Sequence, residues 1–472
     1  MTSMSALVVE ARVLDEADVR DVLDAALGTG GEWAEVYAER RDATSISIDD
    51  HRIEELTSGR DQGAGVRVVK GQQAAYAYTN VLTRQSLLDA ARAAAASLQG
   101  QQMVSVVDLT RVVAPITHAV LRTPSSVSKA EKVAAARAAE EAAWSVGSDV
   151  RQVAASYSDV VQRVFLANSL GHLSDETRTR TRLVCQVVAA RDGIVQTGFE
   201  GPGGSLGAEL LDLYPPATVG RAAAERAVRL LDSVPSPAGE MTVVLNAGGG
   251  GVLFHEACGH GLEADSIVKN TTVYSKRKGS QVGSTLVNGV DDATVVNAWG
   301  SFGFDDEGAP AQRTVLFDAG VQTGEMSDRI SAARLGVPSS GNGRRQSYAH
   351  LPIPRMTNSY ILPGESDPAA ILADVKHGLY AEGLGGGEVN PATGDFVFGI
   401  TEAYLIENGE LTRRVRGANL IGNGPQALSL IDAVGSDFDS KEGMCGKDGQ
   451  WVPVGLGTPT LRIAKLTVGG TE

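Results

Sequence analysis

Short runs of alternating apolar and polar residues, set between two helical segments, dominate the first hundred residues of the sequence. Turn-forming residues separate the runs, which is typical of antiparallel strands. Apolar residues with helical spacing come before them at 15–28 and after them at 82–98. The pattern therefore predicts a unit of helix, strand meander and helix, with its strands at 34–40, 44–50, 51–58, 65–70 and 74–80.

The same order of elements returns in the next hundred residues. A helix is predicted over 128–146, where SKAE at its start has the form of a capping box. Another helix is predicted over 219–233, after strands at 152–160, 162–169, 179–191 and 194–201. We therefore predict an N-terminal α+β domain over 1–235, with a possible duplication of 1–110 as 125–235.

A different composition begins after PSPAG at 235–239, which is typical of a domain boundary. Most of the following segments are strand candidates separated by glycine turns, at 241–247, 294–304, 313–320, 396–422 and 460–468. Helices are predicted over 252–265 and 367–381. The predicted fold class is thus α+β, in which residues 236–472 form a largely antiparallel β domain that carries the helix at 252–265.

The charge of the chain argues against some classes of binding partner, and its cysteine content indicates the redox compartment. The net charge is −15, from 42 basic and 57 acidic residues, which opposes general binding to nucleic acid or to anionic membranes. The sequence contains neither a run of 18 apolar residues nor an N-terminal signal-peptide pattern, so we expect no membrane association and a cytoplasmic location. Three scattered cysteines do not form a disulfide framework, in keeping with a reducing compartment.

The stretch LNAGGGGVLFHEACGHGLEAD (245–265) contains a variant of a familiar zinc motif. In HExxH two histidines four residues apart share one helical face, whereas here His255 and His260 are five apart. In a regular α-helix that spacing rotates the second side chain by roughly 140° from the first. A single π-type turn would bring both onto one face, and Gly259 and Gly261 favour such a distortion. The alternative is a helix end with two satisfied histidines.

A tetrahedral zinc site also requires a third protein ligand. Cys445 is the best candidate, because it lies between Gly443 and Gly446 and its thiolate is a strong zinc donor. A rival set is Glu256, His260 and Glu263, which lie at i, i+4 and i+7 on a regular helix. That set requires no distorted turn, but it leaves His255 and Cys445 unexplained.

Four segments together resemble the TldD/PmbA family of metallopeptidases. They are HEACGHGLEAD (255–265), PRMTNSYILPG (354–364), GLGGGEVNPATGDFVFGI (383–400) and GMCGKDGQWVPVGLGTPTLR (443–462). Because the HExxxH motif and the C-terminal cysteine are both present, the chain resembles the metal-bearing TldD branch and not the metal-free PmbA (TldE) branch. The similarity extends over essentially the whole chain.

This resemblance implies a zinc-dependent peptidase whose metalloprotease domain is 236–472. His255, His260 and Cys445 would hold one Zn²⁺ per chain, and Glu256 would be the general base for a metal-activated water. Peptides or unstructured protein segments would be the substrates. The partner would be a second copy, giving a homodimer, or a metal-free PmbA/TldE-type paralogue, giving a heterodimer.

Further residues are candidates for contact with the substrate or for redox chemistry. Arg355, Asn358 and Tyr360 are predicted donors or substrate contacts, and Gly250 and Gly251 would give the substrate backbone room beside the zinc helix. Cys258 stands where the family pattern leads us to expect an aliphatic residue. A core position is the favoured interpretation of Cys258, and redox sensitivity or an alternative ligand is the other.

Two other functions remain open from the sequence. One is a non-catalytic peptide-binding or assembly subunit with a structural metal. The other is a cysteine-dependent hydrolase that uses Cys258 or Cys445 with a histidine. GGSLG (203–207) fits the letters of a serine nucleophile motif but lacks the required strand before it and helix after it.

Overall fold

A computed structural model describes residues 13–98 and 104–470 of the chain. The N-terminal stretch on which we based the absence of a signal peptide begins in residues 1–12, outside the described part. None of the described helices is both long and apolar enough to cross a membrane.

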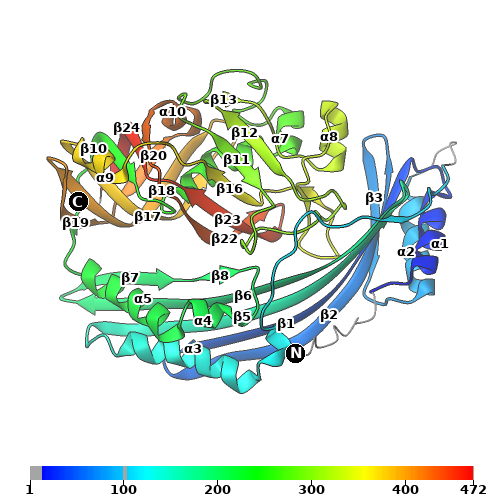
Figure 1. Ribbon diagram of the computed structural model, residues 1–472, viewed down its shortest axis with the longest axis horizontal. Coiled ribbons are helices and arrows are strands. Elements are labelled where there is room, and N and C mark those ends of the chain that lie inside the picture. Colours follow the sequence, from blue (N-terminus) through cyan, green and yellow to red (C-terminus); the bar gives the residue numbers. More distant parts are fainter. Residues whose placement is uncertain (1–12, 99–103, 471–472) are drawn as a thin grey trace, which may run out of the picture.

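The N-terminal half is built on one eight-stranded sheet with the order β3-β2-β1-β5-β6-β4, in which β7 and β8 also pair with β6 (Figure 1). Its strands are β1 (Trp33–Asp49), β2 (Arg52–Lys70), β3 (Gln73–Thr79), β4 (Thr110–Arg111), β5 (Val150–Asn168), β6 (His172–Arg191), β7 (Ile194–Glu200) and β8 (Gly203–Gly204). The antiparallel pairing of β1 with β5 joins the two helix–meander–helix units into a continuous sheet.

Several strands are longer than the sequence predicts. The runs 34–40 and 44–50 are parts of one strand, β1, and 51–58 and 65–70 are parts of β2. Likewise, 152–160 and 162–169 both belong to β5. The polar residues between the runs pair across strands instead of turning the chain, as Asp42 of β1 does with Arg60 of β2 at 2.7 Å.

Four helices cover the ends of this sheet (Figure 1). α1 (Glu16–Leu27) and α2 (Arg84–Ala96) lie at one end, and α3 (Lys129–Trp144) and α5 (Pro216–Leu230) lie at the other, with the short α4 (Leu210–Leu213) nearby. The predicted capping box at the start of α3 is confirmed, because Ser128 and Glu131 bond each other's backbone N–H groups. α3 and α5 cross closely at Gly220, where a Cβ would lie 1.8 Å from the Ala139 carbonyl oxygen.

The C-terminal half contains two larger sheets. In the first, the order β17-β10-β24-β20-β18-β19-β9 and an additional β17–β18 pairing close a ring of five strands, and β21 pairs with β24. Its strands are β9 (Val234–Pro235), β10 (Gly239–Leu245), β17 (His377–Val389), β18 (Asp395–Glu407), β19 (Glu410–Arg416), β20 (Asn419–Asn423), β21 (Ile431–Val434) and β24 (Leu461–Gly469).

The second sheet has the order β13-β12-β11-β16-β23-β22. Its strands are β11 (Gly289–Asp292), β12 (Arg313–Asp318), β13 (Val321–Gln322), β16 (Asn358–Ile361), β22 (Asp439–Lys447) and β23 (Gln450–Thr458). Apart from the HExxxH segment, the other regular elements of the described residues are β14 (Gly343–Arg344), β15 (Ile353–Pro354), α8 (Arg329–Leu335), α9 (Pro368–Ala373) and α10 (Gly424–Ser429), with the short turn Pro124–Ser126 earlier in the chain. Helices and mostly antiparallel strands together give the α+β class that the sequence predicts.

Two elements differ from the sequence-based expectation. The predicted helix 367–381 ends at Ala373, and β17 begins at His377 and pairs in parallel with β10. Gly378 allows that pairing, because a Cβ there would lie 2.6 Å from the Thr242 carbonyl oxygen. The predicted strand at 294–304 is instead a series of turns, whose carbonyls at Trp299 and Ser301 accept hydrogen bonds from Arg180.

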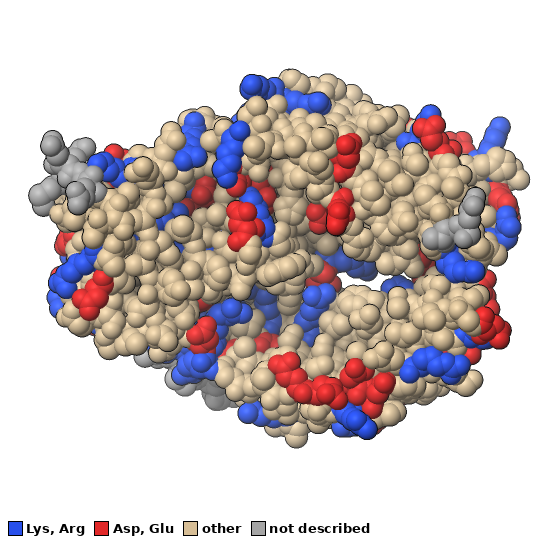
Figure 2. All heavy atoms as spheres, turned by 180° about the vertical axis from the view of Figure 1, so that it is seen from behind, with Lys and Arg blue, Asp and Glu red and all other residues tan. Residues whose placement is uncertain are grey.

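Buried charged residues join the N-terminal sheet to the C-terminal half. We call them the interface ion network; it consists of Glu35 and Arg67 on β1 and β2, Arg178 on β6, and Asp306, Glu307 and Arg345. The two halves also meet outside this network, as at the Arg229–Glu402 pair at 2.8 Å, and Figure 2 shows an opening between the upper and lower parts of the molecule.

Candidate metal centre

The HExxxH segment forms a short broken helix. α6 (Gly251–Phe254) leads into a π-helical turn over His255–Gly259, a 3₁₀ turn over His260–Leu262 and then α7 (Ala264–Lys269). The His260 N–H donates to the His255 carbonyl oxygen, which is the i→i+5 bond of a π turn. The predicted distortion is therefore confirmed, although the predicted helix 252–265 is not a single element.

Gly259 and Gly261 act here through their small size. Gly259 has ordinary helical angles, with φ −56° and ψ −56°. A Cβ on Gly259 would lie 2.0 Å from the Met356 sulfur, and one on Gly261 would lie 2.4 Å from the Tyr274 ring. Both glycines thus let the distorted turn pack directly against its neighbours.

The π turn brings both histidines to the cysteine on β22. His255 Nε2 and His260 Nε2 each lie 3.3 Å from Cys445 Sγ. One donor atom from each of the three residues lies within 4.8 Å of the other two. The side chains come from chain segments 190 residues apart and meet in a largely buried position, where His255 is 3% and Cys445 4% exposed.

This donor set fits zinc. Zn–S and Zn–N bonds of about 2.3 and 2.0–2.1 Å in a tetrahedral site place sulfur and nitrogen roughly 3.5 Å apart. The two 3.3 Å separations are close to that value. Catalytic zinc sites likewise take three protein ligands, drawn from His, Cys and Glu, and keep a fourth position for water or substrate.

Glu256 lies next to the donor cluster and reaches solvent. Its Oε2 is 3.7 Å from His260 Nε2, and its side chain is 28% exposed. A carboxylate in this position has room for a water or a substrate group beside the cluster. The geometry therefore suits a proton acceptor at the mouth of the site.

The environment of Cys445 favours its thiolate form. Burial alone would raise the pKa of the thiol, but the neighbouring His255 and His260 imidazoles lower the pKa to about 5. Because the thiolate, and not the thiol, binds metal, Cys445 is in the ligand form at neutral pH. The site therefore offers one anionic sulfur beside two imidazoles. Burial lowers the pKa of His260, but Glu263 and Cys445 raise it well above its usual value, so this imidazole must give up a proton before its Nε2 can bind a metal.

Glu263 lies on the far side of the His260 ring. Its Oε2 is 3.1 Å from His260 Nδ1, and Lys447 Nζ lies 3.1 Å from the same oxygen. Burial raises the pKa of Glu263, but His260, Lys447 and Arg355 lower it to about 2, so the carboxylate is ionised. The rival ligand set Glu256, His260 and Glu263 does not fit this arrangement, because Glu263 faces Nδ1 while the other donors face Nε2.

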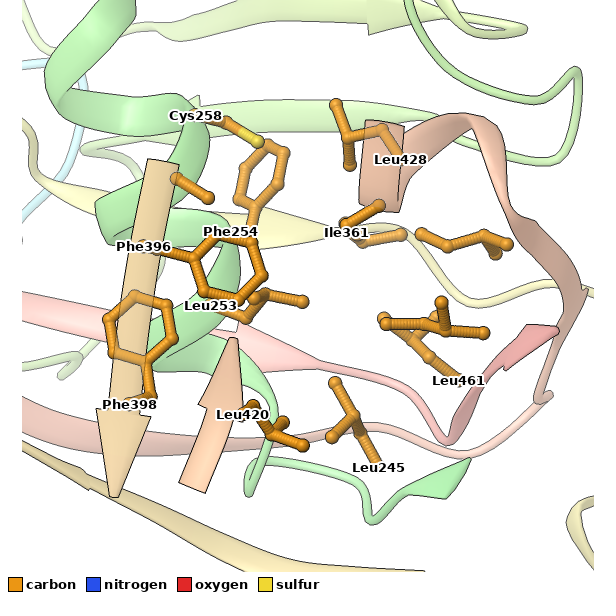
Figure 3. Close-up of a cluster of buried hydrophobic side chains, with 14 of the residues drawn as sticks. Leu245, Leu253, Phe254, Cys258, Ile361, Phe396, Phe398, Leu420, Leu428 and Leu461 are labelled. Atoms are coloured by element: carbon orange, nitrogen blue, oxygen red, sulfur yellow. The ribbon is translucent and has the colours of Figure 1, made fainter. Parts of the chain in front are cut away.

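Cys258 is not part of the donor cluster. It is 1% exposed and belongs to the hydrophobic core of the C-terminal half, next to Phe254 in Figure 3. Burial raises its pKa to about 12. Cys185 is likewise buried among apolar residues of the N-terminal sheet. The position of Cys258 agrees with its core interpretation, and Cys185 lies in the same kind of apolar environment.

Three residues of RMTNSY, the predicted donors or substrate contacts, bond other residues of the protein: Arg355, Asn358 and Tyr360. Arg355 is 0% exposed, and its guanidinium donates to the carbonyl oxygens of Cys445 at 2.6 Å and Gln450 at 3.2 Å. Asn358 is buried and donates to the Asp292 carbonyl oxygen, and the Tyr360 hydroxyl bonds the Asp292 carboxylate at 3.0 Å. Arg355 thus has no surface for a substrate, and its contacts hold the backbone of a ligand instead.

Gly250 and Gly251 are also buried. A Cβ on Gly250 would lie 3.0 Å from Leu245, and one on Gly251 would lie 2.5 Å from the Leu456 backbone. Close packing of α6 onto β10 and β23 therefore explains both glycines. Their role in giving room to a substrate stays a prediction.

Lys447 was not identified from the sequence. It follows Cys445 by two residues on β22, so both side chains lie on the same face of that strand. The expected alternation of a strand over 439–447 is the signal that could have placed Lys447 beside the predicted ligand.

Comparison with known proteins matches this chain along most of its length. Family models described as PmbA/TldA metallopeptidase domain 1, central domain and C-terminal domain match residues 34–98, 122–231 and 238–470. A metalloprotease TldD homolog of Haemophilus influenzae is 40% identical over 93% of both chains. The chain belongs to the TldD/PmbA family. A metalloprotease of Methanothermobacter thermautotrophicus is 35% identical, over 93% of this chain and 96% of its own.

Two solved structures share the fold. A Thermotoga maritima protein superimposes with a TM-score of 0.80 at 21% identity, covering 96% of this chain and 100% of that one. TldE from Thermococcus kodakarensis gives a TM-score of 0.77 at 18% identity, covering 96% and 100%. Relatives named metalloproteases imply a metal in this family, and the described residues contain one cluster suited to it, His255, His260 and Cys445.

Proposed function

We propose that this chain is a zinc-dependent peptidase that hydrolyses peptides or unstructured protein segments. The observation that carries the proposal is the convergence of His255, His260 and Cys445 beside the partly exposed Glu256. His255, His260 and Cys445 would hold one zinc ion. Zinc bound in this way polarises a carbonyl group and lowers the pKa of a water molecule to near neutrality.

Glu256 is the general base of the proposed reaction. Its carboxylate Oε2, next to His260, would take a proton from the attacking water and pass it to the leaving amine. Arg355 would hold the Cys445 backbone in place from behind and would not touch the substrate. A donor set this deeply buried admits a narrow chain segment more readily than the surface of a folded protein, which favours extended substrates.

A second chain completes the proposed assembly. The partner would be another copy of this chain or a metal-free TldE-type paralogue, and the shared fold with a TldE structure supports the second choice. The three cysteines are free in the described structure, in keeping with work in the reducing cytoplasm.

Glu256→Gln tests the proposed role of this residue directly. The variant keeps the three metal ligands, so we expect one zinc per chain and a loss of peptide hydrolysis of about 10²–10⁴-fold. Zinc is measured by elemental analysis, and cleavage of an unfolded peptide mixture by mass spectrometry, with and without a TldE-type partner. Glu240→Gln, at an exposed pair with Lys465 on the surface, is the matched control and should keep full activity.

The other two functions predict different results in the same assay. Full zinc without cleavage of any peptide, even with the partner, would indicate a binding subunit. A cysteine-dependent hydrolase would survive removal of zinc by a chelator and lose activity on alkylation of Cys445. Undiminished cleavage by Glu256→Gln would exclude Glu256 as the base.

A further inference from the structure

The two histidines of the donor cluster differ at their second ring nitrogen. Both direct Nε2 toward Cys445 Sγ, at 3.3 Å in each case. His255 Nδ1 is buried and has no hydrogen-bond partner among the described residues. His260 Nδ1, by contrast, lies 3.1 Å from Glu263 Oε2. Only His260 therefore has a carboxylate that fixes its orientation.

A carboxylate at this nitrogen determines how the imidazole can act. An imidazole that donates a lone pair through Nε2 must carry its proton on Nδ1. Glu263 accepts a hydrogen bond at Nδ1, so it favours that tautomer and holds the plane of the ring. A carboxylate that accepts a hydrogen bond from Nδ1 also makes Nε2 of the same ring a stronger metal donor.

Glu263 is itself held by two cations from other segments. Its Oε2 is 3.1 Å from Lys447 Nζ, and its Oε1 is 3.8 Å from Arg355 Nε. Its side chain is 1% exposed, so water does not compete for these contacts. The carboxylate therefore stays charged and fixed in a dry position behind the His260 ring.

The same two cations connect Glu263 to the strand that carries the third ligand. Lys447 is two residues from Cys445 on β22, and Arg355 donates to the Cys445 carbonyl oxygen at 2.6 Å. One buried carboxylate thus contacts a ligand on the π turn directly and the ligand on β22 through its cations. Loss of the carboxylate would loosen both segments at once.

We propose that Glu263 is the positioning residue of the metal centre, which orients His260 and joins it to the Cys445 strand without binding the metal itself. The inference rests on the proposed function, because it concerns how tightly the three ligands hold zinc. Glu263 acts through His260 and contacts neither metal nor substrate, so it is not a catalytic residue.

Metal affinity of Glu263 variants tests the proposal. We expect Glu263→Ala to weaken zinc binding by about 10- to 100-fold in competition with a chromophoric chelator. Glu263→Gln keeps an oxygen that accepts from Nδ1, so its affinity should lie between those of Glu263→Ala and the wild type. Asp265→Asn is the matched control, because Asp265 bonds Lys447 at 2.7 Å and is not a partner of His260.

Two further measurements separate positioning from a general loss of structure. The absorption spectrum of the Co²⁺-loaded protein should change in Glu263→Ala, since the His260 ligand is no longer held, and should be unchanged in Asp265→Asn. The double variant Glu263→Leu with Lys447→Met removes carboxylate and ammonium together. It should show the same loss of affinity even if Glu263→Ala alone, with its unpaired cations, does not fold.

Wild-type affinity and an unchanged cobalt spectrum in the folded Glu263 variants would overturn the proposal. An affinity in Asp265→Asn as low as in Glu263→Ala would also overturn it, because the effect would then belong to Lys447. If the wild type binds zinc but cleaves no peptide, the proposed function fails while the affinity comparison still decides the role of Glu263.

Discussion

Two buried polar clusters, the interface ion network and the metal centre, are built on opposite principles. In the network every charge already faces its opposite: Arg67 lies 3.0 Å from Glu35 and also contacts Glu307, and Arg178 lies 2.7 Å from Asp306. All these side chains are buried, so each guanidinium offsets the desolvation of a carboxylate. This cluster is complete from the residues of the chain alone.

The proposed metal centre instead gathers donor atoms that suit a shared cation. His255, His260 and Cys445 direct two imidazole nitrogens and a sulfur toward a common position. Each imidazole lies within hydrogen-bond distance of the sulfur, and the same three atoms form a ligand set that a cation can share. Buried polar residues can therefore either join domains or bind a metal. Opposite charges that face each other indicate the first role, and nitrogen and sulfur ligand atoms that converge on one position indicate the second.

Cys445→Ser should produce the largest effect of the changes that test this comparison. The hydroxyl of serine is a far weaker zinc donor than a thiolate. Substitution of a residue that only bonds a ligand lowers metal affinity by up to about 100-fold, so we expect a larger loss of affinity in Cys445→Ser. We expect no zinc in the purified variant, no peptide cleavage, and a metal-free protein that unfolds at the same denaturant midpoint as the metal-free wild type.

Cys258→Ser is the control for the loss of a buried thiol near the same turn, and it should retain zinc. Metal bound to Cys445→Ser as tightly as to the wild type would place the third ligand elsewhere.

Arg67→Met should have the second largest effect and affect stability instead of metal binding. It leaves Glu307 and part of the Glu35 charge buried without their cation, which in proteins destabilises the fold by about 3–5 kcal/mol. We expect a lower urea midpoint with zinc stoichiometry unchanged in the folded protein.

Arg60→Met provides a matched control on the same strand, because the Arg60–Asp42 pair is exposed and its loss should leave the midpoint unchanged. Equal midpoints for the two variants would mean that the network does not contribute to holding the domains together.

The sequence predicts the metal centre better than it predicts the contact between the domains. The spacing of His255 and His260 requires a π turn if both bind one metal, and the structure has that turn. Cys445 could be named because few thiols are available and it lies between glycines in a segment that resembles the family. Such local constraints are visible in a single sequence.

A single sequence does not show which residues are buried by contacts between distant parts of the chain. Arg60 and Arg67 both lie on β2, yet the former is exposed and the latter is fully buried, because the C-terminal half covers only one end of that strand. Arg355 is a candidate donor or substrate contact from the sequence, because its residue type is visible there, whereas its burial against Glu263 and β22 is not. Periodicity also could not show that residues 377–381 would pair with β10 instead of continuing a helix.

The smallest expected effect is the loss of one proton per chain, from the Cys445 thiol, and it tests whether the metal centre holds this sulfur ready for a metal. Burial raises the pKa of a thiol, but His255 and His260 lower that of Cys445 to about 5, whereas burial raises those of Cys258 and Cys185 to about 12. In the metal-free protein, Cys445 should therefore lose its proton as the pH rises through about 5, while the other two thiols stay protonated at neutral pH. Zinc binding at pH 7 should then release no proton from Cys445.

The ultraviolet absorbance of the thiolate, followed against pH in metal-free protein, measures this proton. We expect one step near pH 5 in the wild type and in Cys258→Ser, and no such step in Cys445→Ser. The sign follows from two shifts. The lowered pKa of Cys445 keeps its sulfur ionised down to about pH 5, whereas the raised pKa of His260 means that zinc must displace a proton from this imidazole at higher pH. Zinc affinity should therefore already decrease as the pH drops toward 5, through protonation of His260, and decrease more steeply below about 5, where the sulfur is protonated as well. A single step in the ordinary thiol range, above about pH 8, would show that the imidazoles do not prepare Cys445 for the metal.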